Sequence, residues 1–231
     1  MKKFVYLVAL LLATGSSWAN IVINGTRVIY SEKNKEVIVQ LVNNGDDPSL
    51  VQAWIDDGDI NSTPETAQVP FLLSPPVVKV SGRNGQQLRI KKLPASLPGD
   101  RESVFYLNVL DIPPVPENLK NQNTVQLAIK SRIKLFYRPS SLSGSLDEAV
   151  AKLEVKAEGQ QFRLVNNSPF HITVANIETS GKEMLLNDAV MVNPFSQASI
   201  STRHPVGKGL AIRVKYVDDL GAYKSKSFVA R

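Results

Sequence analysis

Short runs of alternating apolar and polar residues, each ended by a turn signal, fill most of this chain. Glu36–Val42 and Ala211–Val217 are two such runs, and Asn44-Gly45 and Leu220-Gly221 are two of the turn signals. Alternation puts every second side chain on one face of a strand, and these turn residues let the chain reverse tightly. Many short strands at regular spacing predict an all-β fold built from β-sandwiches.

A helix would show apolar residues every three to four positions, and this period is missing from nearly all of the sequence. Only Leu146–Val150 allows a short helix. The runs expected to form strands are Ile21–Tyr30, Glu36–Val42, Leu50–Ile55, Gln87–Lys91, Val104–Leu110, Thr124–Tyr137, Ala151–Lys156, Gln161–Val165, His171–Glu178, Val190–Val192, Ala198–Thr202, Ala211–Val217 and Tyr223–Val229.

The N-terminus is typical of a cleaved export signal. Lys2 and Lys3 precede the apolar run Phe4–Ala13, and the small and polar stretch Thr14–Ser17 follows; Ser17 and Ala19 lie three and one residues before the expected cut. This order of charged, apolar and small residues predicts a signal peptide over residues 1–19 that is cut after Ala19. The alternative is a membrane anchor, but spanning a bilayer takes about 20 apolar residues and this run is shorter. We therefore expect an exported protein.

The remaining residues are enough for two small domains, because a domain typically holds about 100–150 residues. The stretch Pro139–Ser145 is rich in small polar residues and follows the longest strand-like run. We expect it to separate a first domain over residues 20–140 from a second domain over residues 145–231. The alternative is an internal loop, but a similar number of expected strands on each side favours two similar sandwiches.

The chain contains no cysteine, so packed cores must hold the fold together. The formal net charge of +6 is a modest argument for anionic partners, and export argues against nucleic acid. His171 and His204 are the only histidines and have no second ligand at metal-site spacing. The acidic turn Asp56–Asp59 departs from a calcium loop at Ser62 and Gln68. Catalytic and phosphate-binding motifs are also missing, so we expect no enzyme activity, metal, cofactor or small-molecule substrate.

Residues 97–113 carry a longer signature, in which an acidic and a basic residue precede Glu-Ser, an aromatic residue, an Asn and a closing aliphatic-Pro pair. This segment resembles the signature of periplasmic pilus-assembly chaperones, the PapD-like family. Further segments similar to that family occur in the family's order along the chain, before and after this signature, so the resemblance covers essentially all of the chain after residue 19. These segments are Gly25–Tyr30, Pro70–Pro76, Ile133–Pro139, Asn167–Phe170 and Tyr216–Gly221.

The resemblance implies two immunoglobulin-like domains set as a boomerang around a cleft. It implies a periplasmic chaperone whose partners are pilus (fimbrial) subunits and an outer-membrane usher. Such a subunit lacks one strand of its fold, and the chaperone fills the open groove with an apolar strand of its own. One rival hypothesis is a secreted adhesin or sugar-binding module, which would need an aromatic ligand platform that this sequence does not offer. The other is a periplasmic hydrolase. The resemblance also implies one cis peptide bond, at Ser74-Pro75 or at Pro75-Pro76.

The expected donor strand lies within Thr124–Tyr137, where Val125, Leu127 and Ile129 alternate with polar or small residues. Alternation alone favours an ordinary core face, because most alternating strands bury their apolar side internally. The resemblance assigns these three side chains to the groove of the subunit instead. The same apolar edge offers a surface through which the free protein could cap itself as a homodimer.

By the same resemblance, Arg27 and Lys134 are the cleft cations that bind the C-terminal carboxylate of the subunit. Guanidinium matches a carboxylate with two donors, and ammonium adds a point charge. Without the resemblance they would be interpreted as two solvated surface cations. Lys134 and Ile129 have opposite strand parity, so a regular strand places them on opposite faces unless twist or a bulge re-aims one.

The resemblance finally implies an interdomain network formed by Glu102, Arg138 and Asp219, with Asp218 as the alternative to Asp219. One basic residue between two carboxylates could hold the angle between the domains. Its expected role is structural, and its effect depends on burial because exposed ion pairs contribute only about 0–1 kcal/mol.

Overall fold

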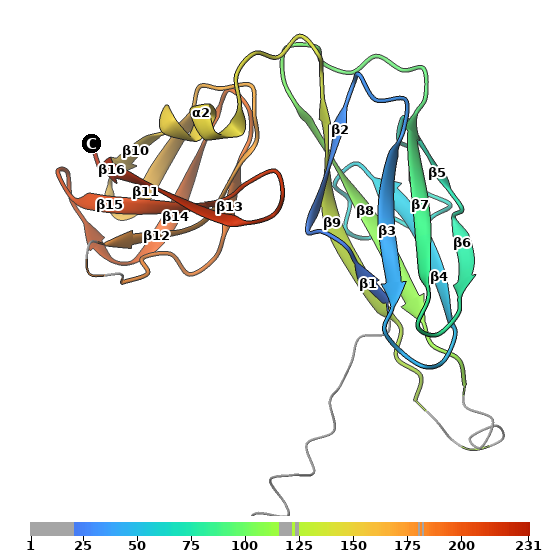
Figure 1. Ribbon diagram of the computed structural model, residues 1–231. Helices are drawn as coiled ribbons and strands as arrows, with labels where there is room; N and C mark the ends of the chain where they lie inside the picture. Colours follow the sequence, from blue (N-terminus) through green and yellow to red (C-terminus); the bar gives the residue numbers. More distant parts are fainter. Residues whose placement is uncertain (1–20, 116–121, 123–124, 180, 182) are drawn as a thin grey trace, which may run out of the picture.

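The computed structural model describes residues 21–115, 122, 125–179, 181 and 183–231 and shows two domains made almost entirely of strands (Figure 1). The prediction of two immunoglobulin-like β-sandwiches is confirmed. In Figure 1 the two domains diverge from the connecting segment at the top of the view. The predicted signal peptide, residues 1–19, lies outside the described residues. No helix in the described ranges combines the length and the apolar character needed to cross a membrane.

The first domain packs a four-stranded sheet, ordered β1-β3-β7-β5, against a five-stranded sheet, ordered β2-β9-β8-β4-β6. Alternation puts Leu41, Leu88 and Leu107 at full burial between these sheets. The strands are β1 (Ile21–Ile23), β2 (Arg27–Ser31), β3 (Val37–Asn43), β4 (Ser49–Asp56), β5 (Phe71–Ser74), β6 (Val77–Val80), β7 (Gly85–Lys92), β8 (Ser103–Ile112) and β9 (Ile129–Arg138).

The second domain packs a three-stranded sheet, β10-β11-β14, against a four-stranded sheet, β13-β12-β15-β16, around Phe162 and Leu164. It opens with the short helix α2 (Leu146–Ala151), where the sequence allowed one, and Ser145 Oγ caps it by accepting from the Glu148 N–H at 3.3 Å. The strands are β10 (Glu154–Ala157), β11 (Gly159–Asn166), β12 (Ile172–Thr179), β13 (Val190–Val192), β14 (Ser196–Val206), β15 (Ala211–Val217) and β16 (Tyr223–Val229).

The start of the chain changes sheet, and this change gives the edge of the first domain its form. β1 pairs with β3, whereas β2 crosses to the opposite sheet and runs parallel to β9. Gly25 lies between the two short strands at a φ of 127°, a conformation that side chains rarely adopt. β2 covers β9 only over Lys134–Arg138, so the first half of β9 has β8 on one side and an open edge on the other.

The strand expected over Thr124–Tyr137 is shorter in the structure, because β9 begins only at Ile129. Its partner β8 pairs up to Asp111 opposite Ile129 and then runs into Pro113 and Pro114. Proline has no N–H to donate, so the ladder cannot continue beyond this point. Of the two peptide bonds considered for a cis conformation, the cis bond is Ser74-Pro75.

Candidate functional site

Arg27 and Lys134 lie side by side on parallel neighbouring strands, at the flank of the first domain that faces the second. Arg27 opens β2, and Lys134 of β9 is its register partner. The Arg27 guanidinium lies 5.8 Å from the centre of the Phe136 ring, and its Nη1 donates to the Val217 carbonyl at 3.2 Å. Because Val217 ends β15, this cation touches both domains.

Neither cation is neutralised by a carboxylate in the part of the chain that the structure describes, since no salt bridge involves either one. Arg27 Nε is buried and has no hydrogen-bond partner. Burial, followed by the charges of Arg27 and Arg132, lowers the pKa of Lys134. Burial also lowers the pKa of Arg27, although Asp219 and other nearby carboxylates oppose this shift. Two partly buried cations with unused donors make a site that favours an anion, above all a carboxylate.

Arg138 joins the two domains through two carboxylates, one from each side. Its Nε bonds to Glu102 Oε1 at 2.7 Å, and its Nη1 and Nη2 bond to the two oxygens of Asp219 at 2.7 and 2.8 Å. The guanidinium also lies 5.1 Å from the centre of the Phe170 ring. The structure thus brings together the three residues Glu102, Arg138 and Asp219. The geometry is two-pronged and partly buried, which makes this network stronger than a surface pair.

His171 also lies at this boundary, although its residue type did not predict that position. Its peptide N–H bonds to Glu102 Oε2 at 2.8 Å, its Nδ1 lies 3.4 Å from the same oxygen, and its ring packs against Phe136. Glu102 in turn donates its peptide N–H to the Pro169 carbonyl at 2.9 Å. In the sequence, only the preceding segment Asn167–Phe170 pointed to this boundary, because it belongs to the family pattern. A contact made through a backbone N–H does not depend on residue type, so the position of His171 could not be predicted from it.

Asp218 has a different role from Asp219. Its Oδ1 accepts from the N–H groups of Leu220 and Ala222 at 3.0 and 2.8 Å and so shapes the turn after β15. Gly221 in this turn has a φ of 84°, and a Cβ built there would lie 2.2 Å from Thr26 Oγ1 of the first domain. The turn therefore presses closely against the start of β2, which fixes where Asp219 meets Arg138.

The apolar segment expected to donate a strand is exposed in this chain. Val125, Leu127 and Ile129 are 89%, 73% and 52% exposed, and they lie outside the core of their own domain. The β8–β9 ladder shows no register shift from Ile129 to Tyr137, so Ile129 and Lys134 point to opposite faces of a regular strand. The segment lies on the chain just before the open half of β9.

A second ion pair lies on the same face of the sheet as Lys134, and the sequence did not reveal it. Asp56 is buried and accepts from Arg132 Nη2 at 2.5 Å, from Asn108 Nδ2 at 2.6 Å and from the Gly58 N–H at 2.8 Å. The Arg132 guanidinium lies 3.7 Å from the centre of the Tyr106 ring. The acidic run Asp56–Asp59 looked like a polar turn, because the pairing of Asp56 depends on strands far apart in the sequence.

The described residues contain no group of His, Cys, Asp and Glu side chains arranged to hold a metal ion. The candidate site combines an exposed apolar segment at the open edge of one sheet, two unneutralised cations further along the same edge, and an ionic contact to the second domain. Such an arrangement can bind an extended chain and a carboxylate.

Two family models match the sequence of this chain. The pili and flagellar-assembly chaperone, PapD N-terminal domain, matches residues 20–143. The pili assembly chaperone PapD, C-terminal domain, matches residues 148–228. The fold and the site define a two-domain chaperone of the immunoglobulin-like class. The chain belongs to the PapD-like family of pilus-assembly chaperones, as the resemblance predicted.

Individual relatives agree with this assignment. The chaperone protein MrkB of Klebsiella pneumoniae is 40% identical over 225 residues, which cover 96% of this chain and 96% of the relative. The crystal structure of the Pseudomonas aeruginosa CupB2 chaperone matches with a TM-score of 0.78 at 33% identity, covering 91% of this chain and 100% of that one. The SafB chaperone, in complex with the Salmonella enterica SafA pilin, shares the fold with a TM-score of 0.80 at 23% identity, over 93% of this chain and 98% of that one.

We predict that Arg138→Ala destabilises the protein strongly. It leaves the Glu102 carboxylate, which is 4% exposed, without its cation, and an unpaired buried charge costs about 3–5 kcal/mol. Urea unfolding followed by circular dichroism measures the loss. The matched control is Arg89→Ala, which removes an exposed cation paired with Glu36 at 3.6 Å and should cost about 0–1 kcal/mol. Equal losses in the two variants would contradict the importance of the network.

The pH dependence of stability should report on Asp56. Burial alone would raise its pKa, but hydrogen bonds from Arg132, Asn108 and Gly58 outweigh burial and lower it. A carboxyl with a lowered pKa stabilises the fold above its unfolded pKa, about 3.9, and this contribution is lost as the pH falls through the folded pKa. Asp56→Asn should therefore be less stable than the parent at about pH 7, with a gap that narrows below about pH 4. A gap in urea midpoint that stays constant over this range would contradict the assignment.

Proposed function

We propose that this protein is a periplasmic chaperone that binds, folds and caps pilus subunits by donor-strand complementation and delivers them to an outer-membrane usher. The observation that carries the proposal is the pair Arg27 and Lys134, two partly buried cations on adjacent strands that no carboxylate of the described chain neutralises. Membership of the pilus-chaperone family supports it, as does the SafB relative, whose structure contains a pilin.

The subunit's C-terminal carboxylate is the anion that fits this pair best. A carboxylate has two oxygens, which matches the two cation side chains, and a chain end can enter a boundary between domains. Charge-assisted hydrogen bonds of this kind contribute about 1.5–3 kcal/mol each. Anchoring the C-terminus of the subunit also sets the register in which its strand pairs with β9. Arg27 Nε, the buried donor without a partner, supports an incoming acceptor at this position.

Val125, Leu127 and Ile129 are the side chains that we propose to fill the groove of the subunit. Their exposure in the free chain is costly, since burying one such side chain is worth about 1.5–3 kcal/mol. The open side of β9 over Ile129–Ile133 offers main-chain donors and acceptors to a strand of the subunit. Three buried side chains and a row of main-chain bonds supply the binding energy without ATP, a cofactor or a small-molecule substrate.

The same exposed segment is available for pairing with a second copy when no subunit is present. We therefore extend the proposal to a self-capping homodimer of the free protein, because an unpaired apolar edge tends to find another strand. Export through a signal peptide cleaved after Ala19 would bring the chain to the compartment where pilins fold. We assign the domains to residues 20–140 and 145–231, and we give Glu102, Arg138 and Asp219 the structural task of holding them at a fixed angle.

We predict that Arg27→Ala and Lys134→Ala each weaken pilin binding by about 10–100-fold, because each removes a charge-assisted bond worth about 1.5–3 kcal/mol. The variants should keep the circular dichroism spectrum of the parent. Co-purification of a pilin from periplasmic extract and its survival against proteolysis measure the effect. Lys79→Ala is the control, since Lys79 is an exposed cation on β6 at the far edge of the same sheet. Pilins that co-purify undiminished with both anchor variants would refute the carboxylate site.

The donor segment can be tested by placing the same negative charge on each of its two faces in turn. Leu127→Asp should lower pilin binding at least about tenfold, because it replaces a groove-filling side chain with a charge that resists burial. Ala128→Asp adds the same charge at the neighbouring exposed position, whose side chain points to the opposite face of an extended strand. It should leave binding nearly unchanged, as measured by the same co-purification. Equal losses at both positions would argue for a general charge effect and against donation.

A further inference from the structure

β16 is an edge strand of the second domain, and most of its outer edge is unpaired. In the first domain β2 runs parallel to β9 and covers half of its edge. In the second domain β10 pairs with β11, and just beyond the end of β16 the Val155 carbonyl and the Ala157 N–H of β10 bond to Arg231 at 2.9 Å each. Along Tyr223–Val229 itself, β16 pairs only with β15 among the described strands, so this stretch has a free edge that ends at the contact between Arg231 and β10.

The ladder between β15 and β16 shows which backbone N–H and C=O groups of β16 do not bond to β15. The Asp218 N–H bonds to the Ala222 carbonyl at 2.9 Å, and the Ala230 N–H bonds to the Leu210 carbonyl at 2.9 Å, one beyond each end of the β15–β16 ladder. Hydrogen-bonded pairs alternate along an antiparallel ladder, so the even-numbered residues of β16 bond to β15 and the odd-numbered ones direct N–H and C=O outward. The outward residues are Tyr223, Ser225, Ser227 and Val229.

Apart from β2 and the open half of β9, the other edge strands are protected in ways that β16 is not. β1, β5, β6, β10 and β13 have only three or four residues each. β14 contains Pro205, and an isolated bridge joins its Thr202 to Leu186. β16 has seven residues and no proline, and all but Phe228 are exposed. A long exposed edge is a template on which another strand can pair.

The inner side of this edge is apolar at its end. A cavity of about 480 Å³ lies between the end of β16 and the segment that joins α2 to β10. Leu153, Val155 and Phe228 supply its apolar wall, and Lys152 and Arg231 are also among the lining residues. A strand added to β16 would turn every second side chain toward this cavity. Those side chains should therefore be apolar.

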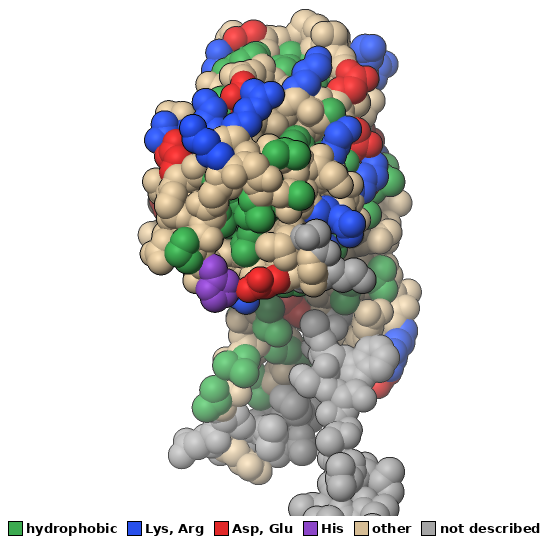
Figure 2. All heavy atoms as spheres, turned by 90° about the vertical axis from the view of Figure 1, so that its left-hand side faces the viewer, with side chains coloured by type: hydrophobic (Ala, Val, Ile, Leu, Met, Phe, Trp, Pro, Cys, Tyr) green, Lys and Arg blue, Asp and Glu red, His purple; other side chains and the backbone are tan. Residues whose placement is uncertain are grey.

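The outer side of the edge is basic. Arg213 and Lys215 of β15 pair in register with Ser227 and Ser225, and these two small residues do not cover the cations on this face of the sheet. Neither cation forms a salt bridge within the residues that the structure describes, although Lys215 Nζ lies 5.2 Å from the centre of the Tyr223 ring. Figure 2 shows this side of the second domain, with exposed hydrophobic side chains bordered by Lys and Arg. An added strand would meet these cations best with acidic side chains.

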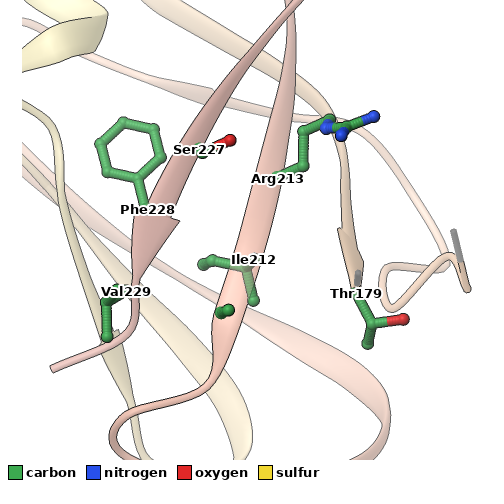
Figure 3. A pocket seen from close by; sticks show the side chains of 7 residues that line it. Thr179, Ile212, Arg213, Ser227, Phe228 and Val229 are labelled. Carbon is green, nitrogen blue, oxygen red and sulfur yellow. The ribbon is translucent and has the colours of Figure 1, made fainter. Parts of the chain in front are cut away.

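A second cavity, of about 380 Å³, lies on the β15–β16 pair and shares Phe228 and Val229 with the first. Figure 3 shows Ile212 directed toward Phe228 and Val229, whereas Arg213 points away from them. The end of β16 is thus flanked by two hollows with apolar residues, and a cation stands at the border of one of them.

We propose that the free edge of β16 over Tyr223–Val229 binds an extended segment of a partner protein whose residues alternate between apolar and acidic, as a strand added beside β16 ahead of the contact between Arg231 and β10. The apolar side chains enter the cavity next to Phe228, and the acidic ones meet Arg213 and Lys215. A second copy of this chain does not fit as the occupant. Tyr223–Val229 contains two lysines and no acidic residue, so a copy would place cations against cations.

The test uses the full chain labelled with ¹⁵N and a synthetic nine-residue peptide in which valine alternates with aspartate. Hydrogen exchange by NMR reads the edge residue by residue. The amides of Ser225, Ser227 and Val229 should slow at least about tenfold with saturating peptide, whereas those of Lys224 and Lys226, already bonded to β15, should change little. A peptide that alternates valine with lysine should not bind. Unchanged exchange at the odd residues, or equal binding of the lysine peptide, overturns the proposal.

Variants separate this edge from the donor segment of the first domain. Ser227→Pro removes an outward N–H that no bond within the sheet uses, and it should weaken the peptide at least about tenfold, while Ser227→Thr keeps the N–H and binds as the parent does. Arg213→Glu should weaken binding and remove its salt dependence. Leu127→Asp, which disables the donor segment of the first domain, should leave peptide binding unchanged. Loss of peptide binding in Leu127→Asp, or protection confined to Ile129–Ile133, places the peptide at the first domain and refutes the site. Should Ser227→Pro fail to fold, the exchange pattern of the parent and the Arg213→Glu result decide.

Discussion

The parallel pairing of β2 with only the second half of β9 is the constraint on which the rest of the structure depends. Where the two strands pair, Arg27 stands beside Lys134, and the same pairing ends at Ser31 and Arg138, next to the boundary with the second domain. Where they do not pair, the first half of β9 keeps an open edge, and the apolar segment before it is exposed. The extent of this one short strand thus separates the pair of cations from the exposed apolar segment along β9.

Burial makes the charges of Arg27 and Lys134 costly as long as neither has a carboxylate partner. Moving a cation out of water favours its neutral form, and the lowered pKa of Lys134 follows from that cost and from the neighbouring charges of Arg27 and Arg132. A bound carboxylate would reverse both effects at once, because it supplies the opposite charge and the missing hydrogen-bond acceptor. The proposed carboxylate site would therefore gain electrostatic stabilisation when an anion binds.

The sequence predicted the bounds of a strand well where the pattern of its own residues determines them, and less well where the neighbouring strand determines where pairing stops. Alternation in Ala211–Val217 gave β15 at its true limits, because one face of that strand is buried and the other is solvated. The start of β9 was predicted too early, since Pro113 and Pro114, which follow the neighbouring strand β8, end the ladder. The family pattern indicated Glu102, Arg138 and Asp219, which the structure brings together, whereas Asp56 with Arg132 and the backbone of His171 escaped notice. Those contacts join residues that are far apart in sequence and whose types are common on any surface.

The acidic residues around Arg27 are arranged so that its charge remains available. Asp219 lies close enough to influence the Arg27 pKa, but both of its oxygens are held by Arg138 at 2.7 and 2.8 Å. Asp218 is occupied by two N–H groups of its own turn and lies 3.5 Å from Lys224 Nζ. Glu102 is divided between Arg138 and His171. If any of these carboxylates were free to turn toward Arg27, it would form an internal salt bridge and compete with a ligand. The interdomain network and the turn after β15 together therefore engage the carboxylates closest to Arg27, which leaves this cation without a salt bridge among the described residues.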